Sequence, residues 1–204
     1  MLEIRDPVVV HVWPDSVSMA LDELRSERAW TAISLVTPDT TLRHAARARI
    51  RSALQDLLGA LLCRPAASIA LLSQPGQAIL LDLPETRIGL SVSHAPGLTV
   101  AAIRLGGAIG IDLIRIEPGV AELPDWERVA QDYLGPQVCR QLATLSSAQR
   151  AAAFAQAWSR WEAGLKCFGL GLTEWTPALE SRLASCAIRP LAVPEPYGGA
   201  MAIG

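Results

Sequence analysis

Two ionisable side chains four residues apart give the first chemical signal in this sequence. Glu162 and Lys166 belong to residues 158–171, WSRWEAGLKCFGLG, which predict a short helix closed by Gly169 and Gly171. On a helix this spacing places both side chains on one face. They can form a surface ion pair that contributes little to stability, or they can be two parts of an active site. The segment alone leaves both interpretations open.

A third ionisable group, Asp112, lies in a strongly apolar stretch. Residues 110–118 read GIDLIRIEP and predict a strand in which Asp112 stands between Ile111 and Leu113. A carboxylate there is costly unless it is paired or binds a cation. Mg²⁺ takes oxygen ligands and is often held by one or two carboxylates together with phosphates. Asp112 is therefore a candidate metal ligand, although Ile114 occupies the next position on its face of the strand.

Residues 91–97, SVSHAPG, place Ser93 and His94 where a predicted strand enters a turn. Hydroxyl groups, backbone amides and an imidazole at such a position suit the binding of an anion. The alternative is a turn that serine side chains stabilise, without a ligand.

Three arginines, Arg43, Arg47 and Arg51, follow one another at intervals of four residues. On a helix they form one cationic stripe, and guanidinium groups bind phosphates through paired hydrogen bonds. A solvated helix face is the alternative. Together with Asp112 and Glu162 for a metal ion, these groups predict a polyphosphate-binding site.

Predicted elements can bring these groups together. The arginines lie on a helix at residues 40–62, and the acid–lysine pair lies on another at 146–168. Between them, residues 88–93, 98–104 and 108–114 predict strands, the last two forming a hairpin. The other predicted elements are helices at 18–31 and 124–134, strands at 8–13, 68–73, 78–81, 183–191 and 200–203, and a turn at Pro75 and Gly76.

A weak internal repeat indicates how these elements are organised. Residues 96–103, PGLTVAAI, resemble residues 197–204, YGGAMAIG. We therefore expect an α+β fold with two similar halves, residues 1–104 and 105–204.

Composition excludes several classes of protein. A net charge of −2 argues against a nucleic-acid-binding protein, and no run of about 18 apolar residues predicts a membrane span. The first residues lack the basic start and apolar core of a signal peptide. The cysteines have no metal-binding or redox spacing, which favours reduced thiols and a cytoplasmic location; they are Cys63, Cys139, Cys167 and Cys186.

The segments SVSH, GIDL and WSRWEAGLK, in this order, resemble the 4′-phosphopantetheinyl transferase family of the larger, surfactin-synthetase-activating type. The resemblance covers residues 40–172, and YGGAMAIG is similar to the closing strand of that family. It implies two α+β halves related by a pseudo-twofold axis, with the active site in a cleft between them. It also implies a monomer in which the halves take the place of two subunits.

The resemblance implies Mg²⁺-dependent transfer of the phosphopantetheine arm of coenzyme A to a serine of an apo acyl or peptidyl carrier protein, with release of 3′,5′-ADP. By position, Asp112 and Glu162 match the family's metal ligands, and Glu162 also matches its general base. Lys166 matches a lysine that contacts phosphate and steadies the leaving charge. The other matches are expected to bind coenzyme A phosphates; they are Ser93, His94, Arg43, Arg47 and Arg51.

Three positions depart from the family pattern. Ile114 replaces an acid, Trp161 replaces a lysine before Glu162, and Gln77 stands where a lysine is frequent. These departures favour an alternative in which the protein binds coenzyme A or a carrier domain without transfer. A metal-dependent nucleotide hydrolase, which would need no carrier, is a further alternative. For the transferase, replacing Asp112 or Glu162 by alanine is expected to abolish transfer and leave folding largely intact.

Overall fold

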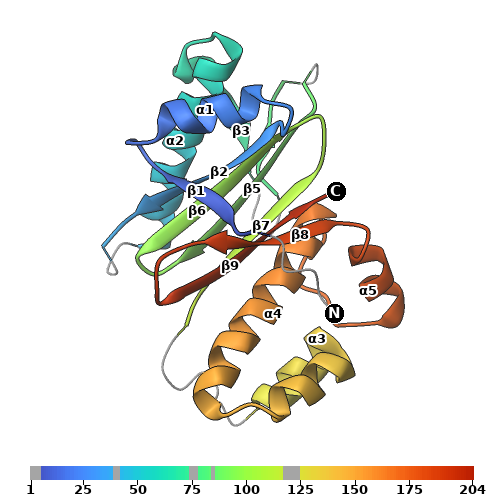
Figure 1. Ribbon diagram of the computed structural model, residues 1–204. Coiled ribbons are helices and arrows are strands. Elements are labelled where there is room, and N and C mark those ends of the chain that lie inside the picture. Colours follow the sequence, from blue (N-terminus) through green and yellow to red (C-terminus); the bar gives the residue numbers. More distant parts are fainter. Residues whose placement is uncertain (1–5, 39–41, 74–77, 84–85, 117–124) are drawn as a thin grey trace.

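The computed structural model describes residues 6–38, 42–73, 78–83, 86–116 and 125–204 (Figure 1). The strands are β1 (Val8–Val12), β2 (Trp30–Val36), β3 (Leu71–Leu72), β4 (Leu80–Leu81), β5 (Ile88–Ala95), β6 (Leu98–Leu105), β7 (Ile109–Arg115), β8 (Ala187–Ala192) and β9 (Tyr197–Ile203). The helices are α1 (Val17–Arg25), α2 (Arg43–Leu62), α3 (Trp126–Ala143), α4 (Ser147–Cys167) and α5 (Pro177–Leu183), with a short 3₁₀ turn at Ala66–Ser68. The fold is a mixed α+β fold, as predicted.

One twisted sheet of seven strands organises the molecule, in the order β5-β6-β2-β1-β8-β9-β7. β1 lies at its centre and is parallel to both of its neighbours, β2 and β8. The other pairs in this sheet are antiparallel. The short strands β3 and β4 form a separate pair.

The two parts of the chain repeat one connectivity. β2, α2, β5 and β6 form a β-α-β-β unit in which β6 lies between β2 and β5 and is antiparallel to both. β7, α4, β8 and β9 follow the same scheme, with β9 between β7 and β8. The two similar sequence segments fall in β6 and β9, the last strand of each unit. A twofold axis between the halves, and the division into two domains, stay predictions.

Helices cover the sheet at two sites (Figure 1). The buried face of α2, including Ile50, Leu54 and Leu57, packs with α1 against β2, β5 and β6. α4 packs against β7 and β9. Between these layers, strands of both halves share one core that includes Val100 and Ile111. This shared core holds the two units together.

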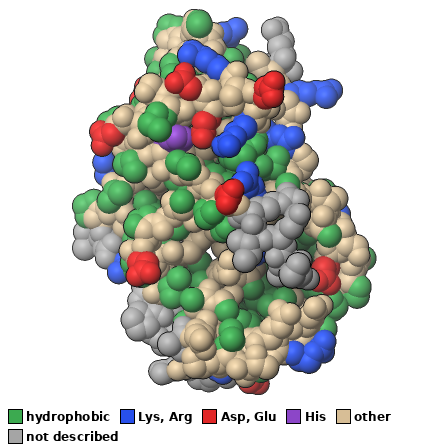
Figure 2. All heavy atoms as spheres, in the orientation of Figure 1, with side chains coloured by type: hydrophobic (Ala, Val, Ile, Leu, Met, Phe, Trp, Pro, Cys, Tyr) green, Lys and Arg blue, Asp and Glu red, His purple; other side chains and the backbone are tan. Residues whose placement is uncertain are grey.

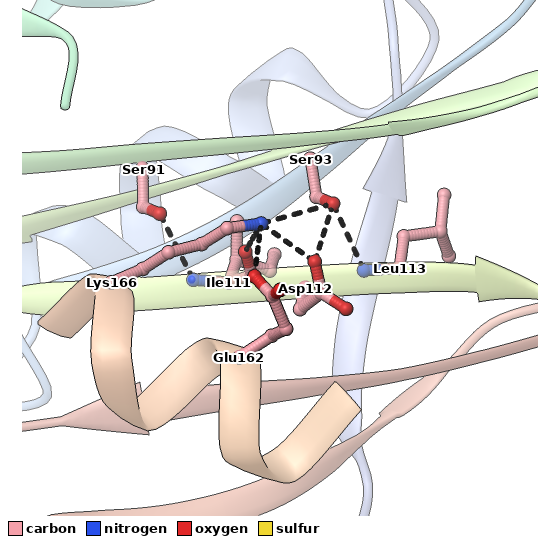
Figure 3. A network of polar contacts seen from close by, with 7 residues as sticks. All are labelled: Ser91, Ser93, Ile111, Asp112, Leu113, Glu162 and Lys166. Carbon is pink, nitrogen blue, oxygen red and sulfur yellow. Dashed lines mark hydrogen bonds and ion pairs between the residues drawn. The ribbon is translucent and has the colours of Figure 1, made fainter. Parts of the chain in front are cut away.

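The two strands at the ends of the sheet order also meet, so the sheet nearly closes on itself. Side chains of β5 reach the backbone of β7, and Figure 3 shows Ser91 and Ser93 pointing toward Ile111 and Leu113. This junction lies beside the predicted active-site residue Asp112.

Several predictions differ from the structure. Residues 98–104 and 108–114 do not form the predicted hairpin, because β6 pairs with β2 and β5, and β7 pairs with β9. The helix predicted at 18–31 ends at Arg25, and Trp30 begins the unpredicted strand β2. Six of the seven β2 residues are buried, so the strand lacks the alternation by which a half-buried strand is recognised. The strand predicted at 183–191 begins only at Ala187, because Thr176 caps α5 through the Leu179 amide at 3.1 Å.

The helix predicted to end at Leu134 continues to Ala143 after an interruption. Gly135 has a φ of +85°, and Pro136 follows it, so α3 is kinked at the predicted end and then resumes. Pro75, Gly76 and Gln77 lie outside the described residues. Within the described part of the chain, no helix is long and apolar enough to cross a membrane.

Candidate active site

A glycine in β7 lets α4 come close enough to place its charged residues over the strand. A Cβ atom at Gly110 would lie 2.0 Å from the Ala163 carbonyl oxygen and 2.5 Å from the Cys167 nitrogen, so no larger residue fits there. α4 begins after Ser146, as predicted, and Gly169 ends it with a φ of +66°. Glu162 and Lys166 therefore lie on a helix that rests directly on β7.

Lys166 is the centre of the resulting cluster (Figure 3). Its Nζ lies 2.6 Å from Asp112 Oδ1 and 4.0 Å from Glu162 Oε2. It also donates to the Ile111 carbonyl oxygen at 3.2 Å and to Ser93 Oγ at 3.3 Å. The nearer carboxylate comes from β7 and not from the helix. The pair on α4 is therefore part of a cluster that joins both elements, and it is not an isolated surface ion pair.

The two carboxylates differ in burial and in charge balance. The Asp112 side chain is 9% exposed and has a direct cationic partner. Burial, followed by the negative charge of Asp112, raises the pKa of Glu162, and Lys166 offsets part of this effect. A carboxylate with a raised pKa is suited to accept a proton near neutral pH.

The donor set fits a divalent cation that shares its coordination with a ligand. Asp112 and Glu162 present carboxylate oxygens to the same ammonium group, and the negative charge of Asp112 is, after burial, a cause of the raised pKa of Glu162. A divalent cation would relieve this repulsion. Within the described ranges, no cluster of three or more His, Cys, Asp or Glu side chains could hold a metal. An ion on these two carboxylates would need water or phosphate oxygens as further ligands.

His94 lies in a positively charged environment that α2 provides. Its Nδ1 is 2.6 Å from Thr99 Oγ1, which orients the ring. Burial, followed by the charges of Arg43 and Arg47, lowers the pKa of His94. Both arginines lie on the exposed side of α2. The structure thus brings two of the three predicted arginines into electrostatic contact with the predicted histidine.

The third arginine and the predicted serine are already engaged within the protein. Arg51 donates to the Leu71 carbonyl oxygen at 2.8 Å and to Ser73 Oγ at 3.2 Å, which fastens β3 to α2. Ser93 is buried and bonded to Asp112. The assignment of Arg51 and Ser93 to coenzyme A binding stays a prediction. Both side chains already have hydrogen-bond partners within the protein.

The described departures from the family pattern lie outside the cluster's contacts. Trp161 is buried in the core between α3, α4 and α5, and its Nε1 donates to the Thr173 carbonyl oxygen at 3.2 Å. It precedes Glu162 by one residue, about 100° around the helix. Ile114 pairs with Gly198 of β9. Trp161 therefore contributes to packing, and the contacts of Lys166 do not involve it.

One sequence signal for this site was not used in the prediction. Lys166 is the only lysine among the 18 lysines and arginines of the chain. All the other basic residues of this count are arginines, and the one lysine side chain lies at the centre of the cluster. Lysine differs from arginine as a strongly hydrated point charge on a flexible stem, so this single exception marks a position with its own chemical requirement.

Comparisons with known proteins agree with the chemistry of the cluster. Residues 108–196 match the family model of the 4′-phosphopantetheinyl transferase superfamily, and this range contains Asp112, Glu162 and Lys166. A Synechocystis sp. protein described as a candidate 4′-phosphopantetheinyl transferase is 29% identical over 125 residues. The aligned region covers 61% of this chain and 49% of that protein. The chain thus spans about half the length of the curated relative that it matches.

Proposed function

We propose that this chain is a 4′-phosphopantetheinyl transferase of the larger, surfactin-synthetase-activating type. It would transfer the phosphopantetheine group of coenzyme A to a serine of an apo acyl or peptidyl carrier protein and release 3′,5′-ADP. The observation that carries the proposal is the contact of 2.6 Å between Lys166 and Asp112, with Glu162 at 4.0 Å from the same ammonium group. All three residues lie in the range that matches the family model.

His94 and the exposed side of α2 are proposed to bind the phosphates of coenzyme A. Arg43 and Arg47 are exposed, and their charges already lower the pKa of His94. A phosphate placed among these three side chains would receive charge-assisted hydrogen bonds. It would also stabilise the protonated form of His94.

The transfer forms a bond between the carrier serine oxygen and the phosphorus that carries the pantetheine arm. The bond from that phosphorus to the bridging oxygen of 3′,5′-ADP breaks. Glu162 is proposed to accept the proton of the serine hydroxyl, as the matching residue of the family does, although a metal ion on the same carboxylate would lower its pKa. Lys166 is proposed to stabilise the negative charge that develops on the phosphate oxygens and the leaving group.

Asp112 and Glu162 would hold Mg²⁺ through their carboxylate oxygens. Bound there, the ion would neutralise charge on the pyrophosphate. Among the described residues, the cluster offers only these two acidic side chains, so the site is suited to a metal that arrives with phosphate oxygens as further ligands.

The alternative is a protein that binds coenzyme A or a carrier domain without transfer. Gln77 and Ile114 favoured it in the sequence, and Gln77 lies outside the described residues. The burial of Trp161 in the helical core weakens one argument for this alternative, because that substitution leaves the contacts of Lys166 unaltered.

An assay of the wild-type protein separates these alternatives. The protein is incubated with coenzyme A, Mg²⁺ and several apo carrier proteins, and intact-mass spectrometry follows each carrier. A mass gain of one phosphopantetheine group per carrier supports transfer. If every carrier stays unmodified beside a working control transferase, the proposal fails. Calorimetry would then show whether coenzyme A still binds, and release of phosphate without a carrier would indicate a hydrolase.

A further inference from the structure

The junction between β5 and β7 is built from serine hydroxyl groups. Both strands are at the ends of the sheet order, so each has an edge that no strand ladder covers. Ser91 Oγ accepts a hydrogen bond from the Ile111 amide at 3.0 Å, and Ser93 Oγ accepts one from the Leu113 amide at 3.1 Å. These hydroxyls satisfy backbone donors of β7 that would otherwise be buried without a partner.

Ser93 makes two further contacts, both to the charged cluster (Figure 3). Its hydroxyl donates to Asp112 Oδ1 at 2.8 Å and accepts from Lys166 Nζ at 3.3 Å. A serine hydroxyl has one donor and two acceptor sites. The Leu113 amide and Lys166 fill the acceptor sites, and Asp112 takes the donor. The hydroxyl therefore has no hydrogen-bonding capacity left for a ligand.

We propose that Ser93 is a positioning residue that fixes Asp112 and Lys166 relative to each other across the β5–β7 junction. The rigid Leu113 amide holds the hydroxyl, and the hydroxyl in turn holds the carboxylate and the ammonium group. Ser93 acts through these two residues and does not bind the phosphates of coenzyme A. The importance of Ser93 for transfer rests on the proposed function. The effect of Ser93 on Lys166 rests only on their contact.

Ser91 provides a matched control two residues earlier on the same strand. It is 6% exposed and Ser93 is 7% exposed, and each accepts one hydrogen bond from a β7 amide. Among the described residues, Ser91 makes no hydrogen bond to Asp112 or Lys166. Ser91→Ala and Ser93→Ala thus remove similar parts of the junction, but only Ser93→Ala removes a contact to the charged cluster.

The first test observes Lys166 directly and needs no enzymatic activity. Because the chain has a single lysine, protein labelled with ¹³C-lysine gives one Cε signal in an NMR spectrum. We expect Ser93→Ala to move this signal and Ser91→Ala to leave it at the wild-type position. Ser93→Ala should lower the melting temperature more than Ser91→Ala, because it also removes a hydrogen bond to the buried Asp112 carboxylate. The proposal is overturned if Ser93→Ala leaves the signal in place, or if both variants move it equally.

The second test measures transfer to a carrier protein. Loss of a side chain that orients active-site ligands typically costs 10–100-fold in activity. We expect Ser93→Ala to lower kcat by roughly that factor with a smaller change in the KM for coenzyme A, and Ser91→Ala to lower kcat by less than about threefold. A rise in KM with an unchanged kcat would instead make Ser93 a substrate-binding residue.

A second pair of variants guards against a misfolded alanine variant. Ser93→Thr and Ser93→Val have similar size and strand propensity, but only threonine keeps the hydroxyl group. Threonine should retain the lysine signal of the wild type more closely than valine does, and equal effects would contradict the proposal. If the wild-type protein transfers nothing, the proposed function fails, and the lysine signal still decides the role of Ser93.

Discussion

At the scale of single residues, the two carboxylates of the cluster are stabilised differently. Asp112 is buried against an ammonium group at 2.6 Å and accepts a hydrogen bond from Ser93. Glu162 lies 4.0 Å from that ammonium, and burial and the charge of Asp112 raise its pKa. The Asp112 carboxylate thus has close partners in the folded protein. Ionisation of Glu162, in contrast, is unfavourable in the folded state.

This difference predicts opposite effects on stability for two neutral substitutions. Glu162→Gln should unfold in urea at pH 7 at the wild-type midpoint or above it, because the raised pKa means that ionised Glu162 destabilises the folded state. Any gain should disappear as the pH falls below the ordinary glutamate pKa of about 4.3, where the carboxyl group is protonated in both states. Asp112→Asn should lose about 1–3 kcal/mol, since it removes a charged hydrogen-bond acceptor.

Both variants should lose transfer activity, by roughly 10²-fold or more for Glu162→Gln if it is the general base. The expectation that replacing Asp112 leaves folding intact is thereby revised, because the structure shows this carboxylate buried and bonded. If Glu162→Gln proves clearly less stable than the wild type, the charge balance described for the cluster is wrong.

A second prediction at this scale concerns the charge field around His94. The lowered pKa of His94 is caused first by burial and then by Arg43 and Arg47. Arg47→Ala should therefore raise this pKa toward the ordinary value, measured by NMR titration of the imidazole signals of the three histidines. Arg49→Ala on the same helix is the control and should leave it unchanged. The arrangement is refuted if both variants behave alike.

Residue types and their order could be predicted from the sequence, but their partners could not. Glu162 and Lys166 are four residues apart, so a helix alone places them together. Ser93 lies 19 positions from Asp112 and 73 positions from Lys166 in the sequence, and only the packed fold brings the three together. Sequence reasoning therefore identified Ser93 as polar and near a ligand, without its role between Asp112 and Lys166.

At the scale of elements, the site depends on how closely α4 rests on β7. Gly110→Ala would place a methyl group 2.0 Å from the Ala163 carbonyl oxygen, so the helix must move. We expect the free energy of unfolding to fall by about 1–3 kcal/mol. We also expect kcat to fall, because Lys166 lies on α4 and Asp112 on β7, and the substitution moves these elements apart. Urea unfolding and the transfer assay measure the two effects.

Gly171→Ala is the control for this prediction, because a Cβ atom at Gly171 has no neighbour within 4 Å among the described residues. This variant should retain wild-type stability and activity. Equal behaviour of both variants would show that the contact between α4 and β7 does not position the cluster.

Elements with local signals were predictable, and those that depend on burial were not. α4 was expected from residues 146–168 and is found at Ser147–Cys167, because both its cap and its terminal glycine are encoded locally. β2 was missed because it is buried on both faces and carries no alternating pattern. α5 is an exception: Thr176 and Pro177 are local start signals, but its seven residues are too few to show a helical apolar pattern.

At the scale of the whole molecule, each β-α-β-β unit packs helices on its own strands, and the two units also share a core. Val100 of β6 and Ile111 of β7 lie in the same buried cluster. The face shown in Figure 2 carries Lys and Arg side chains interspersed with Asp and Glu among its described residues, which agrees with the small net charge. The sequence repeat predicted the two units, but it carried no signal for the closure of the sheet between β5 and β7.

The shared core predicts that the two halves unfold together. Urea unfolding should give one transition, with coincident midpoints for circular dichroism and tryptophan fluorescence. Residues 105–204 expressed alone should not fold, because their apolar face would lose its partners from β2 and β6. Two separate transitions, or a folded fragment, would show that the halves are independent domains.

A crystal structure with coenzyme A and Mg²⁺ bound tests the central claim most directly. The account predicts coenzyme A phosphates among Arg43, Arg47 and His94, the metal ion on Asp112 and Glu162, and Lys166 against the pyrophosphate. Ser93 should keep its hydrogen bonds to the Leu113 amide and Asp112. A coenzyme A molecule bound elsewhere, or a metal ion held without these two carboxylates, would contradict it.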